Sequence, residues 1–159
     1  MWAKKLAERF DSVYTFEPNP LLFKCLTANT QECLNVWSYC AALGNERGCV
    51  NVDHPEKPLN MGAYYVHEGE GKTPTLKIDD LALENVDLIF LDIEGYELFA
   101  LQGAVDTLQK WSPVVVVEWH ENQFERYGYK RNAITNFLKV FGYEPRPLRN
   151  GRDQLFLRV

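Results

Sequence analysis

The stretch that decides the expected fold runs from residue 86 to residue 97, Val-Asp-Leu-Ile-Phe-Leu followed by Asp92-Ile93-Glu94-Gly95-Tyr96-Glu97. Its first half is almost wholly apolar, which is the pattern of a strand buried on both faces. Residues 113–117, Pro-Val-Val-Val-Val, form a second run of this kind. Two such strands with a helical segment between them predict an α/β fold with a mostly parallel sheet.

The remaining elements are predicted from hydrophobic periodicity and from turn residues. Pro20 is expected to open a helix after a strand at residues 13–16, because its missing N–H does no harm there. The last two strands are expected to form an antiparallel hairpin around Asn150-Gly151. Helices are predicted at residues 2–10, 98–111 and 121–141, a helical turn at 79–81, and further strands at 35–43, 48–52, 63–67, 75–78, 143–148 and 154–159.

Composition limits the classes of partner. The chain has 159 residues, 46% of them hydrophobic, which is enough for one domain with a real core. A net charge of -5 argues against a nucleic-acid surface. No apolar run reaches the roughly 18 residues of a membrane-spanning helix, and the N-terminus lacks the pattern of a signal peptide. The four cysteines match no metal or redox spacing. We therefore expect buried, reduced thiols in a cytoplasmic protein that binds neither membrane nor nucleic acid.

Acidic residues follow three of the predicted strands. Glu17 ends the strand at residues 13–16, three acids follow residues 86–91, and Glu118 with His120 follows residues 113–117. In open α/β sheets, ligands bind beyond the carboxyl ends of the strands. This edge of the sheet is therefore the candidate site.

Each acid has a functional and a structural interpretation. Glu17 could accept hydrogen bonds from both hydroxyls of a ribose, or it could cap the next helix. Asp92 is expected to be partly buried and hence to need a partner. Acids clustered here would raise one another's pKa, so that one could act as a general base. Glu97 could instead be stabilised by the dipole of the following helix.

The other candidates at this edge are also open to two interpretations. Gly95 permits a positive φ or the close approach of a ligand. Glu118 and His120 could position a substrate hydroxyl, or they could join Asp92 in an oxygen-rich metal site. They could also be no more than an acid at a strand end and a solvated histidine.

Taken together, these motifs resemble the FkbM family of SAM-dependent methyltransferases. Residues 13–20, Val-Tyr-Thr-Phe-Glu-Pro-Asn-Pro, are similar to the family's V-x-x-F-E-P-x-P. Residues 75–81, Thr-Leu-Lys-Ile-Asp-Asp-Leu, are similar to its T-L-D-D-L. Residues 87–104 resemble D-x-I-K-I-D-V-E-G-x-E-x-x-V-L-x-G-A, with Phe90 in place of the lysine. Residues 113–118 match P-x-x-x-x-E.

The resemblance implies a Rossmann-like class I methyltransferase sheet, S-adenosyl-L-methionine (SAM) as cofactor, and O-methylation of a hydroxyl on a sugar or secondary metabolite. The acceptor would be a small molecule or a glycan. Glu17 would hold the SAM ribose, and Ala41, Ala42 and Leu43 would lie near the adenine. By the same resemblance, Asp92, Glu94 and Glu97 are the catalytic candidates, Gly95 belongs with the cofactor, and Glu118 and His120 face the substrate. No metal ligand is assigned.

One motif of the family has no counterpart in this sequence. The glycine-rich D-x-G-x-N-x-G turn is missing, and with it the first, central strand, so we expect a single, N-terminally truncated domain over residues 1–159. The strand at residues 13–16 is then expected to pair directly with residues 86–91, or a partner chain in a homo-oligomer fills the gap. SAM binding should be weak or absent, because backbone amides of that turn hold the methionine end. The alternatives are a non-catalytic binding or structural module and, less favoured, a metal-assisted enzyme using Asp92, Glu118 and His120.

Overall fold

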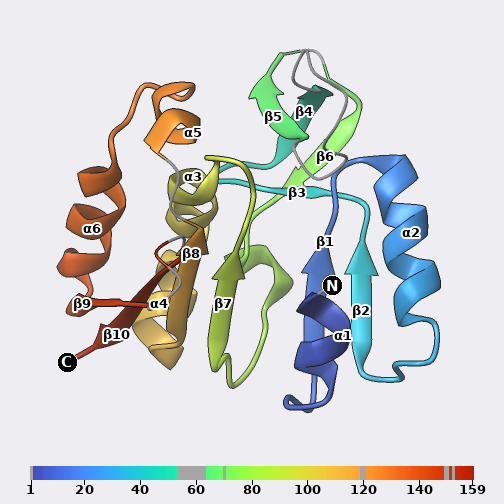
Figure 1. The fold of residues 1–159 in the computed structure, drawn as a ribbon, viewed down its shortest axis with the longest axis horizontal. Helices are drawn as coiled ribbons and strands as arrows, with labels where there is room; N and C mark the ends of the chain where they lie inside the picture. The colour runs from blue at the N-terminus through green and yellow to red at the C-terminus, as the bar shows by residue number, and fades with distance from the viewer. Residues whose placement is uncertain (1, 54–63, 70, 119–120, 149–150, 152) are drawn as a thin grey trace.

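A computed structural model describes the chain except for residues 1, 54–63, 70, 119–120, 149–150 and 152. Its described strands form three sheets; Figure 1 shows two of them side by side and the third above them. The smallest contains β1 (Val13–Phe16) and β2 (Val36–Tyr39), which are parallel, with Val13 opposite Val36. Short β-branched and aromatic runs of this kind suit a pleated, half-buried surface.

The second sheet has the order β7-β8-β10-β9. The strands β7 (Leu88–Leu91) and β8 (Val114–Glu118) are parallel, and they correspond to the two apolar runs of the sequence. The antiparallel hairpin of β9 (Tyr143–Pro147) and β10 (Asp153–Arg158) pairs with β8. The predicted C-terminal hairpin is therefore confirmed.

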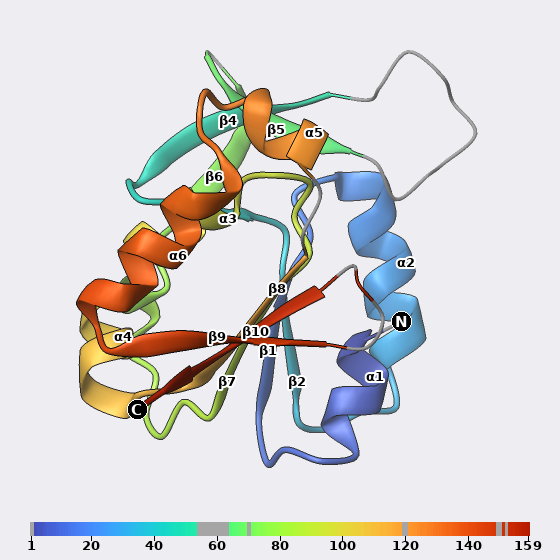
Figure 2. The same ribbon diagram turned by 60° about the vertical axis from the view of Figure 1, so that its left-hand side comes forward.

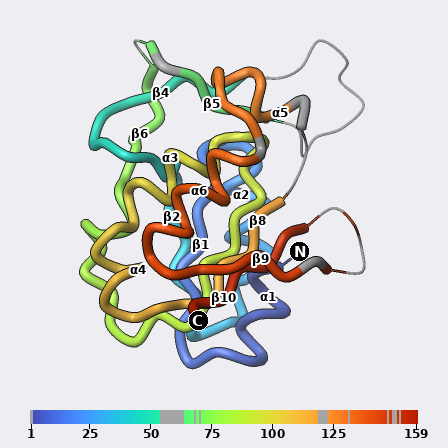
Figure 3. Tube along the Cα trace, turned by 90° about the vertical axis from the view of Figure 1, so that its left-hand side faces the viewer, coloured from blue at the N-terminus to red at the C-terminus, as the bar shows by residue number. Residues whose placement is uncertain are grey.

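The third sheet lies at one end of the molecule, beyond the carboxyl ends of β1 and β7 (Figure 1), and Figure 3 shows its strands β4, β5 and β6 gathered at that end. It has the order β3-β6-β4-β5, built from β3 (Ala42–Leu43), β6 (Thr73–Leu76), β4 (Gly48–Asp53) and β5 (Tyr65–Glu68). Only its β3–β6 ladder is parallel. This sheet covers the edge at which the sequence places the candidate site.

Helices cover both sides of the strands (Figure 2). On one side lie α1 (Trp2–Ala7) and α2 (Pro20–Thr30); on the other lie α3 (Glu97–Gln102), α4 (Val105–Trp111) and α6 (Arg131–Val140). The 3-10 turn η1 (Asp79–Leu81) and the short α5 (Glu121–Glu125) complete the helices described. Pro20 opens α2 as predicted, and the Asn19 side chain caps it by accepting hydrogen bonds from Leu21 N and Leu22 N.

Several predicted elements are interrupted. The helix expected at residues 98–111 is divided into α3 and α4 at Gly103, where a Cβ would lie 2.1 Å from the carbonyl oxygen of Gly44. Asp79 then caps α4 by accepting from Asp106 N and from both the backbone N and the hydroxyl of Thr107. The helix at 121–141 is divided into α5 and α6 by a turn that contains Gly128, whose φ is +73°. The strand at 35–43 is divided into β2 and β3, and the first helix ends at Ala7. The contact of Gly103 with Gly44 joins residues that are distant in the sequence, so a local pattern does not reveal the break between α3 and α4.

The prediction of an α/β fold is correct, but the described strands do not form one mostly parallel sheet. Direct pairing of residues 13–16 with residues 86–91 is wrong, because β1 pairs only with β2 and β7 only with β8 in the described sheets. Two cysteines, Cys25 and Cys49, are exposed and not buried as expected. Among the described residues, no helix is long and apolar enough to cross a membrane.

The main hydrophobic core lies around the β7-β8-β10-β9 sheet. Side chains of β7, β8, α3, α4 and α6 are fully or almost fully buried there, together with Phe156 of β10. From the β1-β2 sheet only Phe16 packs against this core, and it is partly buried. The β1-β2 sheet therefore joins the rest of the molecule through side chains that surround a cavity and not through a shared ladder.

Candidate functional site

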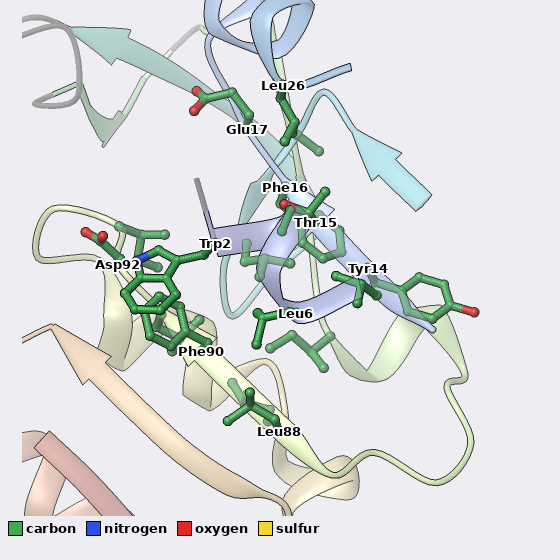
Figure 4. Close-up of a pocket in the computed structure, with 18 of the residues that line it drawn as sticks. Trp2, Leu6, Tyr14, Thr15, Phe16, Glu17, Leu26, Leu88, Phe90 and Asp92 are labelled. Atoms are coloured by element: carbon green, nitrogen blue, oxygen red, sulfur yellow. The ribbon is translucent and has the colours of Figure 1, made fainter. Parts of the chain in front are cut away.

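A cavity of about 850 Å³ lies between β1 and β7 (Figure 4). All residues of both strands line it, and it extends past their carboxyl ends to Glu17, Asp92 and Glu94. A volume of this size is in the range of small-molecule sites. The cavity therefore includes the edge at which the sequence places the acidic residues.

Glu17 lies on the β1 side of the cavity, at the end of the strand. Its Oε1 accepts a hydrogen bond of 2.8 Å from Asn19 N, in the turn that caps α2. Burial raises the pKa of Glu17, and the bond from Asn19 opposes this in part. The carboxylate thus has the structural role of closing the turn, and it also faces the cavity where a ligand could reach it.

The three apolar residues assigned to the adenine form a buried wall. Ala41, Ala42 and Leu43 all line the cavity and are at most 8% exposed. The chain leaves the β1-β2 sheet after Tyr39 and re-enters a sheet at β3, which places this wall next to Glu17's end of β1. The wall is therefore apolar, and two of its three side chains are small.

Carboxylates from two strand ends meet on the β7 side, where Asp92 and Glu94 line the cavity and Glu118 lies outside its lining. Oxygens of Asp92, Glu94 and Glu118 lie within 4.8 Å of one another. Burial is the main reason that the pKa of Glu118 rises to about 8, and the neighbouring charges of Asp92 and Glu94 add to it. Asp92 itself is exposed, so the expectation that it would be partly buried is wrong. Three hard oxygen ligands at this spacing could hold a divalent cation, or Glu118 could take a proton near neutral pH.

The position of Glu94 is fixed by α5. Gln123 donates a 2.6 Å hydrogen bond to Glu94 Oε2, and Arg126 donates to the Glu94 carbonyl oxygen at 3.2 Å. Glu94 has a φ of +59°, a backbone conformation that is uncommon outside glycine and asparagine. Strain of this kind persists only where neighbouring contacts hold it, and it is frequent at functional sites.

Gly95 and Glu97 support this loop from within the protein. Gly95 has a φ of +100°, and a Cβ there would lie 2.5 Å from the carbonyl oxygen of Gln123, so its close neighbour is the protein's own chain. Glu97 is fully buried, and its Oε1 accepts hydrogen bonds of 3.2 Å from Ile93 N and Gly95 N. Burial raises the pKa of Glu97 to about 7. Neither residue is among those that line the cavity in the described chain.

The tertiary structure adds cavity residues that the sequence did not suggest. Trp2 and Leu6 reach the cavity from α1, and the Trp2 ring lies 4.9 Å from that of Phe90 (Figure 4). Tyr64, Val66 and Tyr96 close the carboxyl end from the third sheet and the loop after β7. The candidate substrate residue His120 lies outside the described residues.

Comparison with known proteins identifies the family to which this chain belongs. The family model described as "Methyltransferase FkbM domain" matches residues 2–145, which is most of the chain. This chain belongs to the FkbM methyltransferase family. The resemblance inferred from the sequence motifs is thereby confirmed.

A solved relative has the same fold as this FkbM domain. The crystal structure of Methyltransferase FkbM from Methylobacillus flagellatus matches 98% of the chain with a TM-score of 0.65, at 16% sequence identity. The chain spans only 39% of the length of that structure. A search among curated proteins found no sequence match.

Proposed function

We propose that this FkbM domain forms part of a SAM-dependent O-methyltransferase that modifies a hydroxyl on a sugar or secondary metabolite. The observation that carries the proposal is that Glu17 from β1 and the acids Asp92 and Glu94 after β7 converge on one cavity. The arrangement also fits a Rossmann-like class I sheet, in which the β1-β2 and β7-β8-β10-β9 sheets are two parts. Free cysteines suit a cytoplasmic location.

The residues that line the cavity suit some of the chemical groups of SAM but not all of them. Glu17 would accept hydrogen bonds from the ribose hydroxyls, and the wall of Ala41, Ala42 and Leu43 would contact the adenine. The acidic lining suits the positive sulfonium and ammonium groups. No basic side chain from the described residues lines the cavity, so the carboxylate of SAM finds no cationic partner. SAM binding by this chain is therefore expected to be weak.

The acceptor would lie on the side of Asp92, Glu94 and Glu118. SAM would supply the methyl group, and transfer requires alignment of donor and acceptor with no covalent protein intermediate. Glu118, whose pKa is about 8, is suited to take the hydroxyl proton near neutral pH. Asp92 and Glu94 would orient the acceptor, Glu97 and Gly95 would hold their loop, and His120 stays a candidate on the substrate side.

Calorimetric titration of the chain with SAM tests the cofactor assignment. We expect weak binding, with a Kd of about 1 mM, that Glu17→Gln abolishes and that Glu32→Gln, an exposed control beyond α2, leaves unchanged. Tight stoichiometric binding would contradict the expected weakness. If Glu17→Gln leaves the affinity for SAM unchanged, Glu17 does not bind the ribose. Complete absence of binding would favour the non-catalytic module as the function of this chain.

A second candidate, a metal-assisted enzyme, is favoured by the 4.8 Å clustering of Asp92, Glu94 and Glu118. A cation held by these oxygens would stabilise the folded state by an amount that rises with the logarithm of its concentration above the Kd. If the candidate is correct, millimolar Mg²⁺ or Mn²⁺ should raise the Tm of the chain, and Glu118→Gln should remove the increase. An equal response of the wild type and the variant would exclude this site.

A further inference from the structure

A second, smaller pocket lies on the outer side of β5. Side chains alternate along the chain here, so that Tyr64 and Val66 line the cavity between β1 and β7, whereas Tyr65 and His67 line the second pocket. Among the described residues, Tyr96 is the one that lines both. The strand therefore separates the two spaces, and the outer pocket is distinct from the candidate site.

Aromatic side chains form most of this outer pocket. Tyr96 and Phe99 come from the loop after β7 and from α3, and their rings stack with centroids 4.6 Å apart. Tyr127, which follows α5, meets the Tyr96 ring edge-on, with centroids 5.1 Å apart. Its hydroxyl donates a 2.7 Å hydrogen bond to Val66 O and so holds the end of α5 beside β5 (Figure 2). Aromatic walls of this kind favour a flat apolar ring as ligand.

Arg126 supplies a positive charge to the outer pocket. Its guanidinium lies 3.7 Å from the centre of the Tyr65 ring, a distance at which cation–π attraction is significant. Arg126 takes part in none of the ion pairs found among the described residues. His67, by contrast, has its Nε2 atom 2.8 Å from Asp53 Oδ2, so this histidine is already paired with an acid. Within the described chain, Arg126 is therefore a cation of this pocket without an acidic partner.

The guanidinium of Arg126 also has donors left for a ligand. Of its five N–H groups, one donates to the Glu94 carbonyl oxygen at 3.2 Å. A carboxylate can accept two parallel hydrogen bonds from a guanidinium, and such bonds are stronger than those between neutral groups. The bond to Glu94 connects the outer pocket with the loop that carries the candidate acids.

The size and the charge of the outer pocket limit its ligand. Its volume is about 320 Å³, at the lower end of the range of small-molecule sites, which suits a single ring and not a nucleotide. The larger cavity disfavours an anion, because its described lining includes Glu17, Asp92 and Glu94 and no Lys, Arg or His. A small anionic ring compound is therefore expected to prefer the outer pocket.

We propose that the outer pocket is a binding site for a small aromatic carboxylate. The ring would contact Tyr96, Phe99 and Tyr127, and the carboxylate would accept hydrogen bonds from Arg126. A ligand bound there would fix Arg126 and, through its bond to the Glu94 carbonyl, the loop of the candidate site, without entering the larger cavity. The proposal does not depend on methyl transfer.

Titration of the full chain with benzoate tests the proposal. We expect saturable 1:1 binding with a Kd of about 1 mM, a reasonable affinity for a ligand of this size. Amide NMR signals of Tyr65 and Arg126 should shift, and so should that of Gly95, whose peptide group includes the Glu94 carbonyl. Benzamide lacks the charge and cyclohexanecarboxylate lacks the flat ring, so both should bind more weakly, benzamide by about tenfold or more. Absence of binding, equal binding of the three compounds, or shifts confined to β1 and β7 would overturn the proposal.

Matched variants separate the contributions of the charge and of the ring. Arg126→Gln removes the guanidinium and should weaken benzoate binding about tenfold or more, whereas Arg9→Gln, at an exposed position after α1, should leave it unchanged. Arg126 is itself exposed, so its variant is expected to fold, and an unchanged Tm checks this. Tyr65→Phe keeps the ring under Arg126 and should bind as the wild type does, whereas Tyr65→Leu should bind more weakly. Benzoate binding that is unaffected by Arg126→Gln would overturn the proposal.

Discussion

Glu97 is the residue at which burial and charge oppose each other most directly. Its side chain is fully buried. It holds the loop between β7 and α3 by accepting hydrogen bonds from Ile93 N and Gly95 N. In the unfolded chain the carboxyl ionises near pH 4.5, whereas burial raises its pKa to about 7 in the folded protein. Between these values the folded state binds more protons than the unfolded state.

Stability is therefore expected to fall as pH rises through the range from about 4.5 to about 7. Glu118, whose pKa is raised from 4.5 to about 8, lowers stability in the same direction over a range that extends to about pH 8. Glu97→Gln keeps an oxygen acceptor without the charge, so it should stabilise the protein by about 1–3 kcal/mol near pH 8 and have little effect near pH 4. Urea unfolding at the two pH values measures this.

Glu125→Gln, on the exposed surface of α5, is the matched control and should show no such pH dependence of its effect. If Glu97→Gln were equally destabilising at both pH values, the hydrogen bonds from the loop would outweigh the cost of the buried charge, and the expected sign would be wrong.

The break between α3 and α4 shows how one element depends on another. Asp79 in η1 accepts hydrogen bonds from Asp106 N, Thr107 N and the Thr107 hydroxyl, and so acts as the cap that the N-terminus of α4 lacks in its own sequence. Asp79 N–H in turn donates to Gly103 O at 2.9 Å. The two helices are separate elements because η1 occupies their junction.

Removal of this cap is expected to destabilise α4 and with it the folded protein. Asp79→Ala should lower the free energy of unfolding by about 1–2 kcal/mol, which is typical of the loss of a helix cap. The neighbouring acid Asp80 forms an exposed ion pair with Arg47, so Asp80→Ala serves as control and should cost less. Chemical denaturation of both variants checks the order, and an equal loss in the two would contradict the capping role.

At the scale of the whole molecule, the β1-β2 sheet is the less firmly attached part. The main core is built from the β7-β8-β10-β9 sheet and its helices, and Phe16 is the residue of β1 and β2 that packs against it, only partly buried. No described ladder joins the two sheets. Elements with few buried apolar contacts open at lower cost than the core does.

Native-state hydrogen exchange is therefore expected to show two stages. Amides within β1 and β2 should exchange by local opening, before those of β7 and β8, which should require global unfolding. Mass spectrometry of peptides covering residues 13–16, 36–39, 88–91 and 114–118 measures the order. Equal protection in all four segments would show that the β1-β2 sheet unfolds together with the core.

The sequence by itself determined the family, the α/β class and most elements. Apolar runs at β7 and β8, Pro20 at the start of α2 and the turn at η1 are set by side chains that are neighbours in the sequence. The strand-end acids follow from the same logic, since each is adjacent to its strand. An element could be predicted wherever the side chains that determine it lie within a few residues of it in the sequence.

Only the tertiary structure decided which of these residues meet. It brought Glu118 to Asp92 and Glu94, exposed Asp92, and placed Glu97 beneath the loop and outside the cavity lining. It also separated β1 from β7 by a cavity, where the sequence allowed a direct ladder. These outcomes depend on contacts between distant segments, such as Gly44 against Gly103 and Gln123 against Gly95, and such contacts leave no local pattern in the chain.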